Sequence, residues 1–192
     1  RDNVRRTSTT SREQLAEAQL SMCCYSSAVA GIAREIGLRI KEASLLNATV
    51  ALIEAEKSFK VSIVDGTKGG RPRSIPVTNE SQFKALAIAA QVQSGRRSVM
   101  PENMTWITFV STVLYNGRSA LKDSGITGYH ALRAAYACDR YFEETGHLAP
   151  CNASGRRTAE KELDAQARLI IAEELGHGRV SVLVSYVGSS RG

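Results

Sequence analysis

The sequence is short of several features that mark particular classes of protein. Aromatic residues make up only 6% of it, which disfavours a β-sandwich and suits a mainly helical domain. The four cysteines include no Cys-x-x-Cys pair, and the adjacent residues Cys23 and Cys24 do not have a zinc spacing. No apolar run approaches the ~18 residues that a membrane-spanning helix needs, and the N-terminus shows no signal peptide.

The residues that are present are sufficient for one folded domain. The chain has 192 residues, of which 43% are hydrophobic, enough to bury a core. Its net charge of +6 is typical either of a solvated basic surface or of a protein that binds a polyanion, such as nucleic acid or an acidic membrane. Cys23 and Cys138 lie in apolar helical patterns and are expected to be buried thiols, which fits a reducing cytoplasm.

The pattern of apolar and turn residues predicts a mainly α, α+β domain with one small antiparallel sheet. Residues 60–64 and 73–77 are predicted strands, joined by a Gly-rich turn into a hairpin with Lys68 at its tip. Residues 1–10 are polar and basic and are expected to be a flexible lead-in or the end of a linker. Residues 11–192 are then the domain itself.

Helix boundaries are predicted from capping residues and from apolar spacing. Ser11, Asn79 and Thr127 are the expected N-caps of three helices. Gly37 is expected to end the helix over residues 26–36, and Gly146 the one that Thr127 begins. The predicted helices cover residues 11–23, 26–36, 38–46, 79–90, 103–121, 128–144 and 158–174.

The C-terminal end carries a histidine and a tyrosine that one helix could not bring together. His177 lies nine positions before Tyr186, so a continuous helix at ~100° per residue would hold the two side chains ~180° apart. Gly176 and Gly178 permit a break in the backbone. We therefore expect a turn at His177, followed by a separate short helix that carries Tyr186.

Other polar residues have spacings that suggest a site, although each has an ordinary structural interpretation. Arg39 and Glu42 share a helix face, as do His130 and Arg133. Taken singly, the first pair is typical of a surface ion pair, a hairpin lysine is usually solvated, and a helical histidine is usually structural.

Taken together and in chain order, these residues fall in four blocks of sequence. The blocks are IGLRIKEASLL, GTKGGRPRSIPV, HALRAAYA and ELGHGRVSVLVSYVG. They resemble the four blocks of the catalytic domain in the tyrosine recombinase (phage integrase) family, over about residues 11–188. The resemblance implies an enzyme that breaks and rejoins DNA strands without a metal or nucleotide cofactor.

The resemblance also implies a catalytic role for each of the polar residues that the blocks align with the family. Tyr186 would be the nucleophile that attacks a scissile phosphate, forming a 3′-phosphotyrosyl bond and releasing a 5′-hydroxyl. Arg39 and Arg133 would clamp the non-bridging oxygens. General chemistry agrees, because a phenol with a pKa of ~10 is a weak nucleophile at neutral pH. Two guanidiniums favour the phenolate and neutralise the charge that builds on phosphorus.

The remaining residues of the blocks would assist this reaction. Lys68 would protonate the leaving 5′-oxygen, since a hairpin tip can reach into a DNA groove. His130 and His177 would hydrogen-bond the phosphate or assist proton transfer, and Glu42 would orient its neighbours.

Basic residues outside the catalytic set are expected to contact DNA phosphates, and such contacts read little of the DNA sequence. Each of them taken alone is more often a solvated charge. These residues are Arg71, Arg73, Arg96, Arg97, Arg156, Arg157 and Lys161.

The sequence departs from the family pattern in its length. Arg133 and His177 are 44 positions apart (177 − 133), and the extra residues, about 143–165, resemble a branch of predicted prophage integrases. The chain ends six residues after Tyr186, and no N-terminal core-binding domain is seen, so an isolated catalytic half is expected. With so little chain beyond it, Tyr186 is not expected to be poised in the absence of DNA.

The expected partners follow from the same resemblance. They are double-stranded DNA at a recombination site and further copies of the chain in a tetrameric synapse, with a monomer in isolation and no membrane. The expected location is the bacterial cytoplasm, on DNA. The alternatives are a type IB topoisomerase, which uses a similar pocket to relax supercoils, and a non-catalytic DNA-binding relic of the fold.

Overall fold

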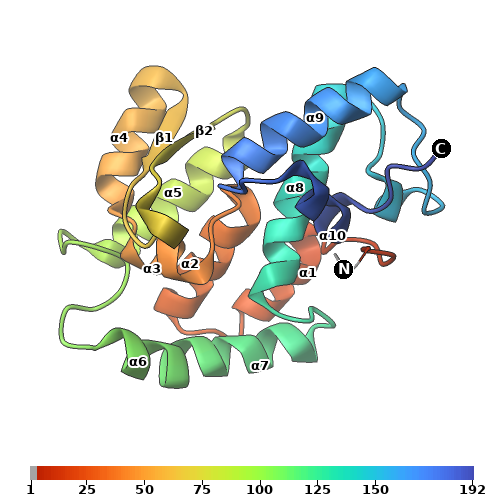
Figure 1. Ribbon diagram of the computed structural model, residues 1–192. Coiled ribbons are helices and arrows are strands. Elements are labelled where there is room, and N and C mark those ends of the chain that lie inside the picture. Colours follow the sequence, from red (N-terminus) through yellow and green to blue (C-terminus); the bar gives the residue numbers. More distant parts are fainter. Residues whose placement is uncertain (1–3) are drawn as a thin grey trace.

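The computed structural model describes residues 4–192, and it confirms a mainly helical α+β fold with a small antiparallel sheet (Figure 1). Its strands are β1 (Lys60–Ile63) and β2 (Arg73–Pro76). The α-helices of this part of the chain are α1 (Arg12–Gln19), α2 (Cys24–Glu35), α3 (Ile40–Leu45), α4 (Ala48–Ser58), α5 (Glu80–Gln93), α6 (Trp106–Phe109), α7 (Tyr115–Asp123), α8 (Tyr129–Thr145), α9 (Lys161–Glu174) and α10 (Val184–Val187). No described helix is both long enough and apolar enough to cross a bilayer.

Helix α2 lies at the centre of the core, packed against both α5 and α8. Its residues Ala30, Ile32 and Ala33 are fully buried, and the alanines let the neighbouring helices approach closely. The chain leaves α2 at Gly37, which has a φ of +70°. A Cβ atom at this position would lie 2.3 Å from the ring of Tyr136, so the turn requires glycine.

The predicted hairpin is confirmed, with Lys60 opposite Pro76 and Ile63 opposite Arg73. Alternate residues of its strands face the core, and Ile63 and Ile75 are almost completely buried there. Before the hairpin lies α4, which the sequence patterns did not predict (Figure 1). Asn47 caps α4, and the helix ends at Phe59 in a left-handed conformation that has no glycine to signal it.

Two of the three expected N-caps are confirmed. Ser11 forms a capping box with Gln14, and Asn79 forms one with Gln82. The third is wrong, because α8 begins one residue later than expected. Its N-cap is Gly128, at a φ of +145°, and Thr127 makes no capping hydrogen bond there.

The long helix predicted for residues 103–121 is interrupted. It starts later, at α6, and continues through a π-helical segment, Val110–Leu114, into α7 (Figure 1). Of the apolar face that includes Trp106 and Phe109, Phe109 is fully buried whereas Trp106 is only partly buried. The wider turn of a π-helix changes which side chains face the core, and residue spacing alone does not reveal it.

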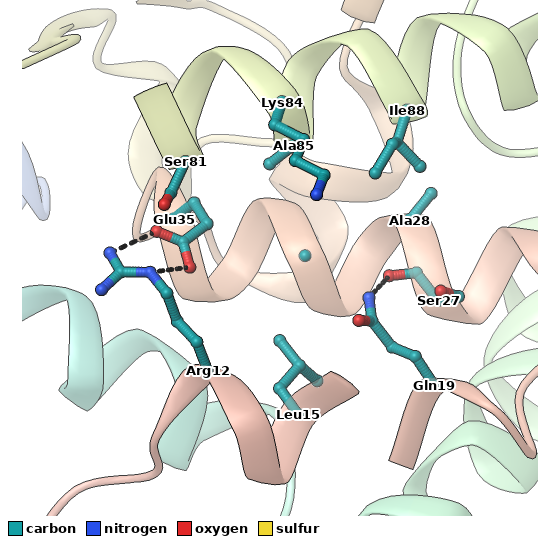
Figure 2. A pocket seen from close by; sticks show the side chains of 11 residues that line it. Arg12, Leu15, Gln19, Ser27, Ala28, Glu35, Ser81, Lys84, Ala85 and Ile88 are labelled. Carbon is teal, nitrogen blue, oxygen red and sulfur yellow. Dashed lines mark hydrogen bonds and ion pairs between the residues drawn. The ribbon is translucent and has the colours of Figure 1, made fainter. Parts of the chain in front are cut away.

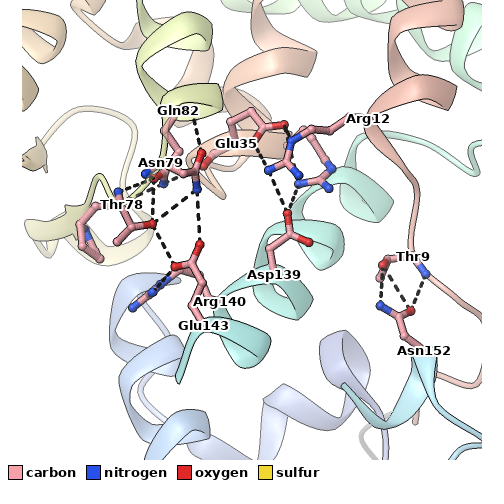
Figure 3. Close-up of polar contacts among 12 residues, drawn as sticks. Thr9, Arg12, Glu35, Thr78, Asn79, Gln82, Asp139, Arg140, Glu143 and Asn152 are labelled. Carbon is pink, nitrogen blue, oxygen red and sulfur yellow. Dashed lines mark hydrogen bonds and ion pairs between the residues drawn. The ribbon is translucent and has the colours of Figure 1, made fainter. Parts of the chain in front are cut away.

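Charged side chains join the helices on the face shown in Figure 3. Arg12 of α1 donates to both carboxylate oxygens of Glu35 in α2, at 3.0 and 2.8 Å, and to Asp139 of α8 at 3.1 Å. Gln82 of α5 accepts a hydrogen bond from the backbone N–H of Thr78 and donates to the carbonyl of Glu35. These contacts hold α1 against α2 and α8, and α5 against α2.

The expected lead-in is packed against the domain where the structure describes it. Residues 1–3 lie outside the described residues. The N–H of Arg5 donates to the carbonyl of Val184 at 2.8 Å, and the N–H of Thr9 donates to the side chain of Asn152 at 2.9 Å. These bonds fasten residues 5–9 beside α10 and the loop after α8.

The cysteine prediction is half right. Cys138 is buried as expected, but Cys23 is exposed, because it is the N-cap of α2 and lies at the surface end of that helix. The Sγ atom of Cys138 lies 3.5 Å from that of Cys151, and both sulfur atoms lie near the carbonyl of Tyr186, at 3.6 and 3.7 Å. Cys151 belongs to a short 3-10 turn, Pro150–Asn152, within the long connection from α8 to α9.

Candidate active site

The break predicted at His177 is present, and it brings His177 and Tyr186 together. Gly176 has a φ of +65°, and the N–H of His177 donates to the carbonyl of Ala172 at 2.8 Å, which closes the end of α9. A 3-10 turn, Val180–Leu183, then leads into α10. The Nε2 atom of His177 lies 3.1 Å from the hydroxyl of Tyr186.

Tyr186 is docked in the protein rather than displaced from it, so the expectation that it would not be poised is wrong for this structure. Only 4% of the surface of Tyr186 is accessible to solvent. Its ring makes edge contacts with His130 and His177, at centroid distances of 4.9 and 5.4 Å. One backbone hydrogen bond, from Arg5 to Val184, and the packing of Val187, which is fully buried, anchor this short helix.

Arg39 and Glu42 pair at the start of α3, where Arg39 is the N-cap residue. The N–H of Arg39 donates to Glu42 Oε2 at 2.8 Å, and its guanidinium donates to Glu42 Oε1 at 2.9 Å. The carboxylate is completely buried, whereas the Arg39 side chain is 27% exposed. One residue pair therefore both begins a helix and holds a guanidinium at the edge of the site.

The residues around Tyr186 form one cluster, which contains Arg39, Glu42, His130, Arg133 and His177. Arg133 is its most buried cation, with a side chain that is 3% exposed. Its guanidinium donates to two backbone carbonyls, those of Gly37 and Leu175, and to the hydroxyl of Tyr186 from Nε at 3.4 Å. The carbonyls belong to the turn after α2 and to the end of α9. Arg133 therefore fixes both segments around the tyrosine.

A cleft of about 440 Å³ opens beside Tyr186. Arg39 and Arg133 place two positive charges in its wall, where an anion would be attracted. The residues that line it are Leu38, Arg39, Ile40, Arg118, Thr127, Gly128, Tyr129, His130, Arg133 and Tyr186.

The two histidines of the cluster are held in the neutral form. Burial lowers the pKa of His177 to about 4, and the nearby guanidiniums of Arg133, Arg39 and Arg73 act in the same direction. Desolvation and the Arg133 charge also lower the pKa of His130. Each ring can therefore offer a lone pair as well as an N–H at neutral pH.

The structure does not join Lys68 to this cluster. Lys68 is exposed at the hairpin tip, in a short 3-10 turn (Lys68–Gly70) in which Gly69 and Gly70 both have positive φ values. Within residues 4–192, its side chain makes no hydrogen bond or ion pair. The predicted position of Lys68 at the hairpin tip is confirmed. Lys68 would contact the other site residues only if the hairpin moved towards them or a bound substrate joined them.

The basic residues expected at DNA are exposed, partly buried or, in the case of the Arg73 side chain, buried. Arg71, Arg97, Arg156 and Lys161 are exposed, as phosphate contacts require. Arg96 and Arg157 are partly buried: Arg96 lies over the ring of Tyr25, and Arg157 donates to the carbonyl of Ser190.

Arg73 is a correction to the expected DNA contacts. Its side chain is only 8% exposed because it turns inward to ion-pair with the buried Glu42. The sequence also gave no sign of Arg118, which lies on α7 and lines the cleft. Local sequence does not predict the position of either side chain, because each position depends on how distant segments pack.

Other hollows lie apart from this cluster. Figure 2 shows one of about 200 Å³ between α1, α2 and α5, which shares no residue with the cleft beside Tyr186. Among residues 4–192, no group of three or more histidine, cysteine or acidic side chains is arranged to hold a metal ion.

A comparison with protein families identifies the chain. A family model described as Integrase matches residues 5–139, which is 135 of 192 residues (139 − 5 + 1). The match contains Arg39, Glu42, Lys68, His130 and Arg133, and it ends before the segment that carries the tyrosine. No curated protein matches the chain. The chain therefore belongs to the integrase family, DNA-binding proteins of site-specific recombination, and its domain is of the tyrosine recombinase type.

Proposed function

We propose that this domain cleaves and rejoins DNA strands through a covalent bond between Tyr186 and a 3′-phosphate. The observation that carries the proposal is the position of the Tyr186 hydroxyl. It lies 3.1 Å from a neutral histidine and 3.4 Å from a buried guanidinium, beside a cleft with a second guanidinium in its wall. A nucleophile, a proton acceptor and a cation clamp are the groups that phosphoryl transfer to a phenol requires.

In the first step, the Tyr186 oxygen attacks the scissile phosphorus. Its proton would pass to His177 Nε2, which accepts it in the neutral tautomer that carries the ring proton on Nδ1. Arg39 and Arg133 hold the non-bridging oxygens, where negative charge builds in the transition state. Arginine suits this task because its planar fork matches two oxygens.

The leaving group departs as the new bond forms. The bond from phosphorus to the 5′-oxygen breaks, and Lys68 gives a proton to that oxygen, so the products are a 3′-phosphotyrosyl bond and a 5′-hydroxyl. The exposed hairpin tip supports this role, because an exposed lysine can follow the DNA into the groove. His130 would bond the phosphate from the cleft wall, and Glu42 would orient the two arginines.

Rejoining is the same reaction in reverse. A 5′-hydroxyl from another strand gives its proton to Lys68 and attacks the phosphotyrosyl phosphorus, and Tyr186 leaves as His177 returns the proton that it took. The number of phosphodiester bonds is unchanged, so no nucleotide has to be hydrolysed.

The biological setting that we propose is a prophage or another mobile element in a bacterium. Four copies of the chain would join two DNA sites in a synapse, and a single copy would remain a monomer. The exposed residues Arg71, Arg97, Arg156 and Lys161 would contact phosphates, so binding should weaken steeply as salt rises.

The test is a suicide duplex with a nick beside the cleavage site, so that the released strand diffuses away and the adduct accumulates. Incubation of the full-length protein with this duplex should give a protein–DNA band that resists denaturation and maps to Tyr186. Absence of the adduct over a set of attachment-site candidates would favour a DNA-binding relic. Relaxation of any supercoiled plasmid without paired sites would favour a topoisomerase.

A further inference from the structure

A buried arginine of the hairpin contacts the site without facing its cleft. Arg73 opens β2, five positions after Lys68, and its side chain is 8% exposed. It is absent from the wall of the cleft beside Tyr186. Because other protein atoms surround it, its position favours an indirect action on the site over a direct contact with DNA.

The guanidinium of Arg73 uses all three of its nitrogen atoms. Nη1 and Nη2 donate to the two oxygens of Glu42, at 2.9 and 2.8 Å, and Nε donates to the carbonyl of Glu174 at 2.7 Å. The first contact is a two-pronged fork, the strongest geometry for this kind of pair. The second ties the hairpin to the last turn of α9, two residues before Gly176.

The chain leaves space for this arginine at Gly176. A Cβ atom there would lie 3.2–3.3 Å from Nη1, Cδ and Cζ of Arg73, closer than side chains normally pack. The φ of +65° also favours glycine at this position. The turn that orients His177 and the approach of Arg73 therefore depend on the same glycine.

The charges around Glu42 are unequal in number. One buried carboxylate meets three guanidiniums: Arg73 in the fork, Arg39 at 2.9 Å and Arg133 at 3.7 Å. Burial opposes the charge of Glu42, yet the hydrogen bonds from Arg73 help to hold its pKa below the usual range. The fork thus balances the carboxylate with a cation that cannot reach the cleft.

We infer that Arg73 is a positioning residue, which neutralises Glu42 so that Arg39 and Arg133 keep their charge for the scissile phosphate. Without it, the buried carboxylate would have only those two cations as partners and would draw them away from the phosphate. The inference rests on the proposed function, because it names the support of the same cation clamp.

The test compares four forms of the full-length protein: the wild type, Arg73→Gln, Glu42→Gln and the double variant. The measurement is the single-turnover rate of adduct formation on the suicide duplex at saturating protein, with DNA affinity measured separately. Arg73→Gln should slow the adduct about 10²-fold, since it weakens transition-state charge stabilisation, while DNA affinity changes less than about 3-fold because the side chain does not face DNA.

The double variant supplies the readout that a purely structural role would not move. Once Glu42 is neutral, Arg73 has no charge to balance, so Arg73→Gln should cost less than about 3-fold in the Glu42→Gln background. Lys60→Gln is the matched control, because it removes one positive charge from an exposed position of the same hairpin. It should leave the rate at the wild-type value.

The outcomes are distinguishable. A wild type that forms no adduct refutes the proposed function itself. A wild type that reacts, with Arg73→Gln within about 3-fold of it, overturns the inference alone. So does an equal loss from Arg73→Gln in both backgrounds. If Arg73→Gln does not fold by itself, the double variant is compared with Glu42→Gln, and a further loss of about 10²-fold there overturns the inference.

Discussion

The arginine side of the site and the lysine side are built in opposite ways. Arg133 is held by two backbone carbonyls and lies between two helix ends, and Arg39 is fixed by two hydrogen bonds that it donates to Glu42. Lys68 is exposed at the end of a two-stranded hairpin, where Thr67 precedes it and Gly69 and Gly70 follow it. The groups that would hold the phosphate are therefore rigid in the fold, and the group that would protonate the leaving strand is not.

This contrast has a physical reason. A charge clamp works best when it is already oriented before the reaction, because no energy is then spent on reorganisation. A general acid for a leaving strand has to follow an atom that moves with the DNA, and an exposed tip can do so. Changes at the buried Arg133 should therefore affect both stability and cleavage, whereas changes at the tip should affect cleavage alone.

The largest effect is expected for Tyr186→Phe, which removes the attacking oxygen and keeps the buried ring. We expect no detectable adduct on the suicide duplex, with DNA binding retained, because no nearby group replaces the phenol. Gel analysis under denaturing conditions measures the adduct, and a binding titration is the control. An adduct that persists in this variant would exclude Tyr186 as the nucleophile.

The next effect separates the two arginines of the clamp. Arg133→Ala and Arg39→Ala should each slow adduct formation by about 10³-fold or more. Only Arg133→Ala should also unfold easily, losing about 2–4 kcal/mol, because two buried carbonyls lose their donor. Single-turnover kinetics and denaturant unfolding measure the two quantities. Equal stability of the two variants would contradict the rigid frame assigned to Arg133.

Lys68→Ala should separate cleavage from stability. We expect a loss of about 10²–10⁴-fold in adduct formation, the usual range for a general acid, and a stability change within about 0.5 kcal/mol, since the side chain is exposed. A duplex with sulfur in place of the bridging 5′-oxygen sharpens the test, because a thiolate leaves without a proton. The variant should approach the wild-type rate on this duplex, and a loss that stays undiminished would exclude an acid role.

The smallest effect concerns pH. The pKa of His177 is about 4 in the folded protein, whereas a histidine of the unfolded chain titrates near ~6.5. The unfolded state therefore binds more protons between these values. The His177 contribution to stability is complete above pH ~6.5 and is lost as pH falls towards 4.

Replacement of this histidine should flatten that part of the stability curve. Between pH 7 and 4.5, His177→Asn should lose less stability than the wild type, by on the order of 1 kcal/mol after allowance for solvent at this half-buried site. Denaturant unfolding at several pH values measures the difference. His147→Asn, which removes an exposed histidine, is the control. An unchanged slope in His177→Asn would contradict the low pKa.

Sequence patterns predicted the parts of the fold that depend on neighbouring residues. The N-caps Ser11 and Asn79, the hairpin and the glycine after α8 are all local, and each was found where expected. Helix α4 was missed because Phe59 ends it in a left-handed conformation that normally calls for glycine. The π-helical segment before α7 was missed because its residues follow an ordinary helical pattern.

The site was predicted to a different degree for each residue. The tyrosine segment and the Arg39–Glu42 pair could be located because glycines and helical spacing mark them. The inward turn of Arg73 could not be predicted, since the same residue in a hairpin would be exposed unless a buried carboxylate lay beneath it. The docking of Tyr186 also depends on partners more than forty positions away, such as Arg133.

The Arg39–Glu42 pair at the start of α3 also has a consequence for the order in which the site assembles during folding. The Arg39–Glu42 contact spans three positions, so it can form on the timescale of helix formation. The contact of Arg133 with Tyr186 spans 53 positions and that with Gly37 spans 96, and such closures cost more chain entropy. A refolding chain would therefore complete its first cation early and gain its nucleophile only when the distant segments have met.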